Sequence, residues 1–320
     1  MNLIHYFVDL LKKSNHISFT LFKLMIPIII IIKLLEEIGL VIFLSEWLTP
    51  VMQWVDLPGA MGLVWATALI TNLYGGIVVF ASLAAETPMT VAQVTIISSM
   101  MLIAHALPVE ARIAQKAGVS ISLTLLLRVG LAIVFGIIFS QIYLFTDTLQ
   151  QAAVLAWAPE NNVDHSLISW IKNQLISLLL IYCIVFALVL LLDVLQRLGI
   201  IDKINKFMRP VLHLLGIGRE AETITLVGLT LGISYGGALL INEAQAGHIK
   251  PVDVLYSVSL LGLSHSLIED TLLMMLIGAD LTGILLGRVL FTFVMIYLMV
   301  RLVKRCSSQS VERYMVKSVP

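Results

Sequence analysis

The feature that most constrains this chain is an internal repeat, in which uncommon residues of the first half recur in the same order in the second half. The matching pairs, at one constant offset, are Gly39 and Gly199, Pro50 and Pro210, His105 and His265, Glu110 and Asp270, Gly118 and Gly278, and Arg128 and Arg288. Tyr74-Gly75-Gly76 recurs one position beyond this offset, as Tyr235-Gly236-Gly237. Because chance does not align so many uncommon residues in order, we interpret the chain as two copies of one structural unit.

Long apolar stretches place this unit in a membrane. The chain is 59% hydrophobic and 12% charged, whereas soluble domains contain about 25% charged residues. Segments 17–36, 119–145, 175–193 and 281–303 reach the ~20 apolar residues with which a helix crosses the ~30 Å hydrocarbon layer. We therefore predict an all-α integral membrane protein. Its formal net charge of zero gives no reason to expect a nucleic-acid partner.

Each copy is predicted to contain three transmembrane helices, one interfacial helix and one re-entrant hairpin. The segments of the first copy are a span at 17–36, an interfacial segment at 40–56, a hairpin at 60–86 and a helical pair at 89–117 and 119–144; those of the second are 171–197, 201–216, 220–247, and 251–278 with 280–303. The hairpin arms are too short to cross the bilayer singly. The first helix of each pair is too long for it, so we expect a break near Pro108 in one copy and near Gly262, Ser264 and Ser266 in the other.

Three crossings per copy make consecutive copies face opposite sides of the membrane, so the repeats are predicted to have inverted topology. The predicted domains are 1–145 for the first repeat, 146–168 for an outer linker, 169–305 for the second repeat and 306–320 for a cytoplasmic tail. Basic residues such as Lys12, Lys203 and Lys304 gather in the loops and ends that this topology places inside the cell. We expect a multi-pass protein of the cell inner membrane with both termini cytoplasmic.

Two carboxylates and two arginines fall inside predicted spans, where charge is costly and usually functional or paired. Glu110 and Arg128 flank one predicted turn between helices at similar depths, and Asp270 and Arg288 flank its counterpart. One interpretation is that each pair is a structural ion pair that ties a helical hairpin together. The other is that the arginines bind an anionic group of a solute through the guanidinium fork.

Two histidines stand close to the predicted helix breaks. His105 or His265 can carry a proton, contact a solute or form a structural hydrogen bond with a carbonyl that the break exposes. Glu269 lies one helical turn beyond His265, but no further ligands with metal spacing follow it. We therefore predict neither a metal site nor a cofactor. The chain also lacks recognisable catalytic motifs, so an enzyme is not predicted.

The hairpin tips are the other candidate part of a binding site. Transporters with inverted repeats bind their solutes near the midplane, where interrupted helices expose polar backbone groups. The candidates on the tips and on the second descending arm are Asn72, Tyr74, Gly75, Gly76, Ser234, Tyr235, Gly236, Gly237, Asn242 and Glu243. The structural alternative is that Tyr-Gly-Gly only permits a tight turn between closely packed helices.

The order of span, interfacial helix, hairpin, broken helix and span, present twice, resembles the core of the concentrative nucleoside transporters. The tips, together with Ile-Ala-His-Ala-Leu-Pro-Val-Glu at 103–110 and Leu-Ser-His-Ser-Leu-Ile-Glu-Asp at 263–270, resemble more closely the bacterial nucleoside recognition or gate-domain membrane proteins. That group includes the gate region of the ferrous iron transporter FeoB and the spore maturation proteins. The resemblance covers roughly 15–305 in layout. It implies a helical membrane fold with a site between two hairpins and two broken helices.

These features predict a membrane transporter of a small polar or anionic solute. We expect it to work in the lipid bilayer as a homo-oligomer and to use a proton or sodium ion for coupling. The alternative is a non-transporting gate or scaffold subunit of a larger membrane complex. A membrane-embedded enzyme is a third hypothesis, which the missing motifs disfavour.

Overall fold

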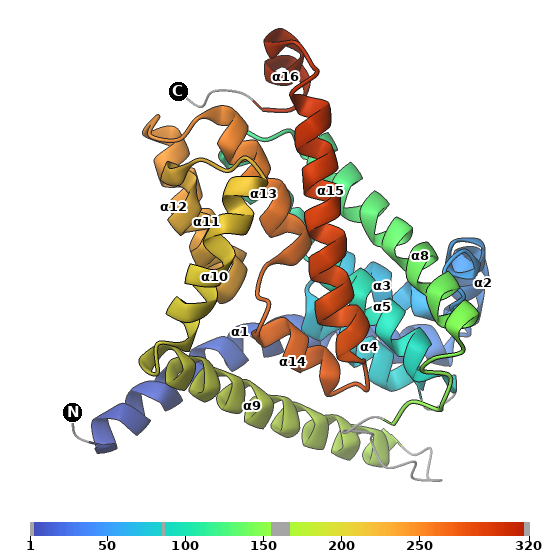
Figure 1. Ribbon diagram of the computed structural model, residues 1–320. Helices are drawn as coiled ribbons and strands as arrows, with labels where there is room; N and C mark the ends of the chain where they lie inside the picture. The colour runs from blue at the N-terminus through green and yellow to red at the C-terminus, as the bar shows by residue number, and fades with distance from the viewer. Residues whose placement is uncertain (1–2, 85–86, 155–166, 317–320) are drawn as a thin grey trace.

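The regular structure of the chain is helical. The computed structural model describes residues 3–84, 87–154 and 167–316 (Figure 1). The helices of the first half are α1 (Leu3–Glu37), α2 (Leu40–Gln53), α3 (Met61–Ile70), α4 (Leu73–Ala84), α5 (Val91–Ile103), α6 (Leu107–Lys116), α7 (Ile121–Leu125), the π-helical η1 (Leu126–Gly130) and α8 (Leu131–Thr146). Those of the second half are α9 (Leu167–Arg197), α10 (Ile200–Leu214), α11 (Arg219–Leu231), α12 (Ile233–Gln245), α13 (Pro251–Ser264), α14 (Glu269–Met275), the π-helical η2 (Thr282–Gly287), α15 (Arg288–Val303) and α16 (Ser308–Tyr314). Within the described ranges only two isolated β-bridges occur, so the predicted all-α class is confirmed.

Both halves have the same order of elements. Each begins with a long helix and a short one, continues with two short helices joined by a sharp bend, and ends with an interrupted helix and a long helix that includes a π-helical segment. The turns also agree: Gly39 and Gly199 have φ of 73° and 66°, and Gly118 and Gly278 have φ of 97° and 93°. A positive φ favours glycine, which explains why these residues recur in the sequence.

Among the described residues, six helical segments are long and apolar enough to cross a membrane. They are His5–Leu35, Val91–Lys116, Ile121–Thr146, Leu167–Arg197, Pro251–Met275 and Thr282–Val303. Three of them fall in each half, as the sequence predicts. Their outward faces carry exposed large apolar side chains such as Phe19, Leu126, Leu175 and Leu290. Exposed surface of this kind is stable where a helix faces lipid.

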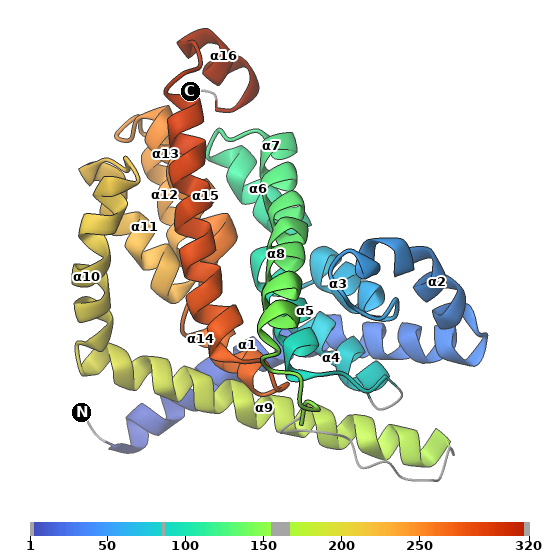
Figure 2. The ribbon, with the colours of Figure 1, turned by 45° about the vertical axis from the view of Figure 1, so that its right-hand side comes forward.

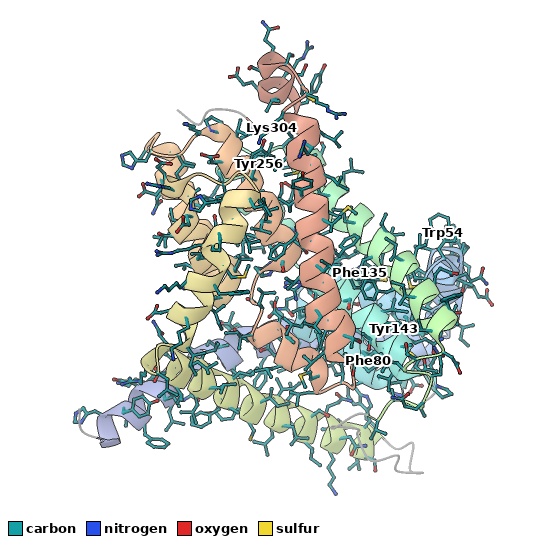
Figure 3. All side chains as sticks on the ribbon, viewed as in Figure 1. Trp54, Phe80, Phe135, Tyr143, Tyr256 and Lys304 are labelled. Carbon is teal, nitrogen blue, oxygen red and sulfur yellow. The ribbon has the colours of Figure 1, made fainter. Side chains whose placement is uncertain are left out.

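Equivalent helices of the two halves run antiparallel. Tyr143, near the end of α8, hydrogen-bonds to Thr282 at the start of η2, with 3.2 Å between the hydroxyl oxygens. At the opposite end, the segment that precedes α7 pairs with the segment that follows α16 (Figure 2). Between these ends, Phe135 of α8, labelled in Figure 3, packs edge to face on Phe291 of α15, with ring centroids 5.3 Å apart. The two halves therefore contact each other along these helices.

The long helices α1 and α9 also pack antiparallel. The Tyr6 hydroxyl donates to Asp193 Oδ2 at 2.8 Å, and the Tyr182 hydroxyl donates to Asn15 Oδ1 at 2.7 Å. In both views α9 runs crosswise to α15 (Figures 1 and 2). The helices have 35 and 31 residues, or ~52 Å and ~46 Å at 1.5 Å per residue. Helices of this length cross a ~30 Å layer obliquely.

The C-terminal region contains a further helix. The expected tail at 306–320 contains α16, whose Val311 is buried, and Val316 pairs with Val119. This segment therefore folds back onto the turn between α6 and α7. Most of the expected linker at 146–168 falls on 155–166, which lie outside the described residues.

Candidate functional site

The two interrupted helices break just before or at a buried histidine. After α5, Ala106 has a left-handed conformation with φ 47°, and Pro108 occupies the first turn of α6, where a missing N–H leaves no helical bond unmade. After α13, Ser266 has almost the same conformation, with φ 49°. The breaks thus lie in the predicted regions. Their sharpest bends are at Ala106 and Ser266, each directly after a histidine.

Backbone hydrogen bonds from the neighbouring hairpins hold both breaks. Ala106 N donates to Ala68 O of α3 at 2.9 Å, and Leu267 N donates to Leu229 O of α11 at 3.0 Å. An interrupted helix leaves N–H groups without helical partners, and the hairpin supplies an acceptor for one of them. Each α3–α4 or α11–α12 hairpin is therefore coupled to the break of its own half.

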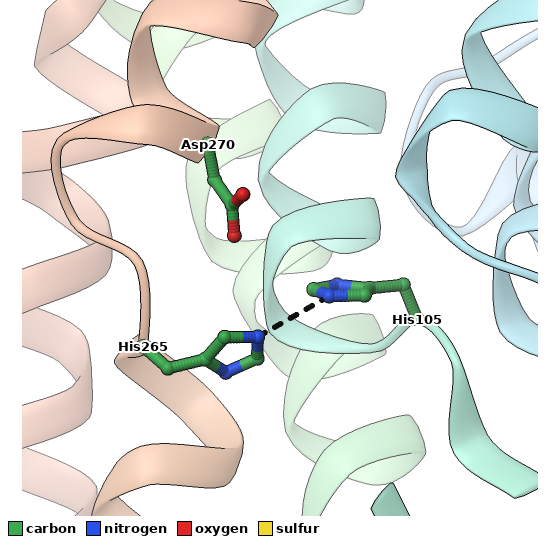
Figure 4. Close-up of side chains that lie close together, drawn as sticks. All are labelled: His105, His265 and Asp270. Carbon is green, nitrogen blue, oxygen red and sulfur yellow. Dashed lines mark hydrogen bonds between the residues drawn. The ribbon is translucent and has the colours of Figure 1, made fainter. Parts of the chain in front are cut away.

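His105 and His265 face each other across the junction of the halves (Figure 4). Their Nε2 atoms are 3.3 Å apart. Each Nδ1 lies against a backbone carbonyl oxygen one turn earlier, at 2.8 Å from Met101 O and 2.7 Å from Leu261 O. Both side chains are buried. The backbone contacts orient both rings so that each Nε2 points at the other histidine.

Glu110 and Arg128 form a buried ion pair beside these histidines. Arg128 Nη1 lies 2.5 Å from Glu110 Oε2, and Arg128 Nε donates to a backbone carbonyl at the end of α5 at 3.0 Å. The other carboxylate oxygen, Glu110 Oε1, lies 3.4 Å from His105 Nε2 and 3.7 Å from His265 Nε2. The carboxylate therefore bridges the arginine and the histidine pair.

The second half arranges its charges differently from the first, and the structure does not support the ion-pair interpretation of Asp270 and Arg288. Among the described residues Asp270 makes no ion pair with Arg288, which instead donates from Nε to Leu263 O at 3.2 Å and from Nη2 to His265 O at 2.5 Å. The Asp270 carboxylate points towards the two imidazoles (Figure 4), with an oxygen within 4.8 Å of a ring nitrogen of each. Residues that are equivalent in sequence, Glu110 and Asp270, thus have different partners.

Several donors in this cluster have no protein partner. Arg128 and Arg288 are 1% and 0% exposed, yet Arg128 Nη2 and Arg288 Nη1 make no hydrogen bond to the described residues. The buried hydroxyls of Ser264 and Thr271 are likewise unpartnered in the described part of the chain, and both equivalents in the first half are alanines. Analysis of the sequence missed these two hydroxyls. The available signal was a hydroxyl residue close to the break of the second half at a position where the first half has alanine.

The first hairpin tip is closely packed. Asn72 Oδ1 accepts a hydrogen bond from Gly75 N at 2.9 Å and so caps the start of α4. A Cβ on Gly76 would lie 2.6 Å from Met101 Cε and 2.8 Å from Ala68 Cβ. The geometry favours the structural alternative for Asn72, Gly75 and Gly76, which together permit the turn and its close contact with α5.

The second hairpin uses its glycines in the same way and also reaches the other half. A Cβ on Gly236 would collide with the backbone of Gly228 in α11. A Cβ on Gly237 would lie 2.8 Å from Ile113 Cγ2 of α6. The α12 helix therefore packs against the interrupted helix of the first half.

Other predicted site residues do not join the cluster. Asn242 is exposed, and Glu243 pairs with His248 at 2.6 Å near the exposed end of α12. The side chains of Ser234 and Tyr235 lie outside the described part of the structure. The second descending arm thus does not contribute the polar contacts expected from Asn242 and Glu243.

Tyr74 and Glu269 lie at the edge of the cluster. Both side chains are partly buried. Tyr74, which belongs to the first half, lies within electrostatic range of the carboxyl groups of Glu269 and Asp270 in the second half. These residues extend the polar region from the first hairpin to the second break.

The fold and this cluster define a multi-pass helical membrane protein with a polar site buried at the junction of its halves. The site offers free N–H groups from two arginines together with carboxylate and imidazole acceptors. In surroundings of low dielectric constant, such groups hold a small charged or polar species strongly.

Comparison with known proteins agrees with this class. The chain is similar to the uncharacterized membrane protein YvoD of Bacillus subtilis (strain 168), with 26% identity over 276 residues that cover 85% of this chain and 86% of that protein. No family model and no solved structure matches the chain. The similarity supports a multi-pass membrane location.

Proposed function

We propose that this protein is a transporter of a small polar or anionic solute in the inner membrane. One observation carries the proposal: Arg128, Arg288, Glu110, Asp270 and the two helix breaks converge where the halves meet. Transporters built from inverted repeats bind their solutes at this position. Charges at such depth are costly and mark solute or ion pathways. The guanidinium N–H groups without protein partners match an anionic or polar group of a solute.

The proposal includes inverted topology and re-entrant hairpins. Its support is that α8 and α15, like α1 and α9, run antiparallel although they are equivalent in sequence. The hairpin arms α3, α4, α11 and α12 have 10, 12, 13 and 13 residues, fewer than the ~20 needed to cross. The hairpins would then enter from opposite faces and end beside the cluster.

The proposed movement is a displacement of each hairpin together with the break that it holds. The hydrogen bonds from Ala106 N to Ala68 O and from Leu267 N to Leu229 O link these parts. Movement of one hairpin against the α8 and α15 helices would open the cluster to one side of the membrane at a time. Access to the site would thus alternate between the two sides of the membrane, as in other transporters with inverted repeats.

The resemblance to the nucleoside recognition or gate-domain proteins belongs to the same proposal. It rests on the two Tyr-Gly-Gly motifs and on segments 103–110 and 263–270, which contain both breaks and the acids Glu110, Glu269 and Asp270. The name of the relative from Bacillus subtilis specifies no solute. The solute class proposed here therefore follows from the donors and acceptors of the site itself.

The test is solute flux through liposomes that contain the purified full-length chain. Carboxylates, phosphorylated compounds and nucleosides are first screened for those that raise the melting temperature, and the hits are measured under proton, sodium and voltage gradients. We expect flux that Arg288→Gln abolishes while the variant stays folded, and that the exposed control Glu243→Gln retains. Absence of both ligand stabilisation and flux would contradict the proposal. Activity only in a stoichiometric complex with another protein would instead favour the gate or scaffold subunit.

A further inference from the structure

The two histidines face each other through ring nitrogens that both accept hydrogen bonds. Each Nδ1 lies 2.7–2.8 Å from a backbone carbonyl oxygen. A carbonyl only accepts hydrogen bonds, so each Nδ1 carries the ring proton and each Nε2 of the neutral rings is an acceptor. These two Nε2 atoms are 3.3 Å apart (Figure 4). Two facing lone pairs repel unless a positive species lies between them.

Two carboxylates add further acceptors at the same point. Glu110 Oε1 lies 3.4 Å from His105 Nε2 and 3.7 Å from His265 Nε2, while Arg128 occupies the other oxygen, Oε2. The Asp270 carboxylate approaches from the second break, with an oxygen within 4.8 Å of a ring nitrogen of each histidine. All four acceptors are buried. Buried charges are usually paired or coordinated to a metal ion, and Arg128 contacts only one oxygen of this set.

The distances among three of these ligand atoms match those between neighbouring ligands of a tetrahedral metal ion. Bonds of ~2.0–2.1 Å from zinc to imidazole nitrogen or carboxylate oxygen place neighbouring ligand atoms about 3.3–3.4 Å apart. The triangle formed by the two Nε2 atoms and Glu110 Oε1 has edges of 3.3, 3.4 and 3.7 Å. We propose that His105, His265, Glu110 and Asp270 bind one divalent transition-metal ion of the zinc type at the junction of the two halves.

The surrounding contacts are those expected around metal ligands. Histidine ligands usually donate their second ring N–H to a carbonyl or carboxylate, which fixes the tautomer, and ligand carboxylates are themselves hydrogen-bonded. Met101 O and Leu261 O orient the imidazoles, and Arg128 holds Glu110. Two imidazole nitrogens favour Zn²⁺ and Co²⁺, whereas Mg²⁺ and Ca²⁺ prefer oxygen ligands.

Because the proposed ligands come from both halves, a bound ion would link the halves. His105 and Glu110 flank the break between α5 and α6, and His265 and Asp270 flank the break between α13 and α14. A bound ion joins the two breaks and adds its binding free energy to the stability of their contact. This binding does not depend on whether a solute is transported.

Cobalt binding tests the proposal, because Co²⁺ in a tetrahedral site absorbs visible light. Untagged full-length protein in detergent is treated with a chelator, freed of it and titrated with Co²⁺, followed by Zn²⁺ or Mg²⁺. We expect one Co²⁺ per chain, an absorption spectrum typical of tetrahedral coordination, displacement by Zn²⁺ and no displacement by Mg²⁺. His265→Gln should weaken Co²⁺ binding by at least about 100-fold, since loss of a contact around a ligand already costs 10–100-fold.

The matched control is His248→Gln, which removes an exposed histidine that pairs with Glu243. It should bind Co²⁺ as the unmodified protein does. The proposal is overturned if the folded unmodified protein binds neither Co²⁺ nor Zn²⁺. This result is expected if the two histidines share only a proton. It is also overturned if folded His105→Gln and His265→Gln variants bind as tightly as the control. Metal binding without solute flux would contradict the proposed transporter alone, and flux without metal binding would contradict the metal site alone.

Discussion

At the scale of single residues, the two halves use equivalent acids in different ways. Glu110 is paired with Arg128 at 2.5 Å, whereas Asp270 is directed at the histidines and Arg288 donates to backbone carbonyls. Equal spacing in sequence therefore does not produce equal pairing. The difference makes the two acids a natural pair for mutational comparison.

The Glu110–Arg128 pair should behave as a coupled unit. Arg128→Gln leaves a buried carboxylate without its partner, so we expect a loss of about 3–5 kcal/mol in the free energy of unfolding. Adding Glu110→Gln to this variant removes the unpaired charge and should recover part of that loss. Titration of the detergent-solubilised proteins with denaturant measures both effects. A double variant no more stable than Arg128→Gln would contradict structural pairing.

Substitution of Asp270 should not lower the free energy of unfolding as substitution of Glu110 does, when both are measured in protein freed of metal with a chelator. Asp270→Asn removes a buried charge that has no ion-pair contact with Arg288, so we expect the free energy of unfolding to stay the same or to rise. Glu110→Gln should lower it under the same conditions, because Arg128 then loses its partner. The melting temperatures of the two variants, each compared with that of the unmodified protein, measure these effects. Equal destabilisation by both substitutions would show that the second acid is also paired.

At the scale of elements, the glycines of the hairpins set how closely helices approach. Gly236 in α12 lies against the backbone of Gly228 in α11, and Gly76 in α4 lies against α3 and α5. The repeated glycines of the Tyr-Gly-Gly motif are thus explained by packing at both hairpins. The polar groups of the site come instead from the interrupted helices and from the arginines that follow them.

Substitution at two glycines should separate close packing from helix propensity. Gly236→Ala places a Cβ against backbone atoms that cannot rotate away, so we expect destabilisation of about 1–3 kcal/mol. The control is Gly130→Ala, where the nearest atom to a new Cβ is Leu126 Cδ1 at 4.0 Å. That change should be neutral or should stabilise by up to about 1 kcal/mol, since glycine weakens helices. Thermal unfolding in detergent compares the two, and similar melting temperatures would contradict the close contact.

At the scale of the whole molecule, the two halves meet antiparallel and share one buried cluster. Contacts at both ends of the α8–α15 pair fix their opposite directions. His105 and His265 lie 160 positions apart in sequence and meet at this junction. The assembly of the site therefore depends on how the halves pack, and the inverted topology is the proposal that connects this packing to the membrane.

Labelling of single cysteines tests the inverted topology. In a background with Cys183→Ser and Cys306→Ser, a cysteine replaces Gln53 near the base of the first hairpin or His248 near the base of the second; both positions are exposed. A membrane-impermeant maleimide added to intact cells or spheroplasts should label Gln53→Cys. It should label His248→Cys only after the membrane is opened. Labelling of both positions from the same side would contradict opposite insertion of the hairpins.

The sequence by itself determined the helical membrane class, the number of long apolar helices in each half and the regions where two of them break. These properties follow from local physics: the length of an apolar segment, the missing N–H of Pro108 and the spacing of a repeated pattern. Only the tertiary structure decided that Asp270 turns away from Arg288, that the tail packs against the turn before α7, and that four acceptors from both halves converge. No metal spacing could be read along the chain, because the two pairs of ligands are far apart in sequence and meet only when α5 packs against α13.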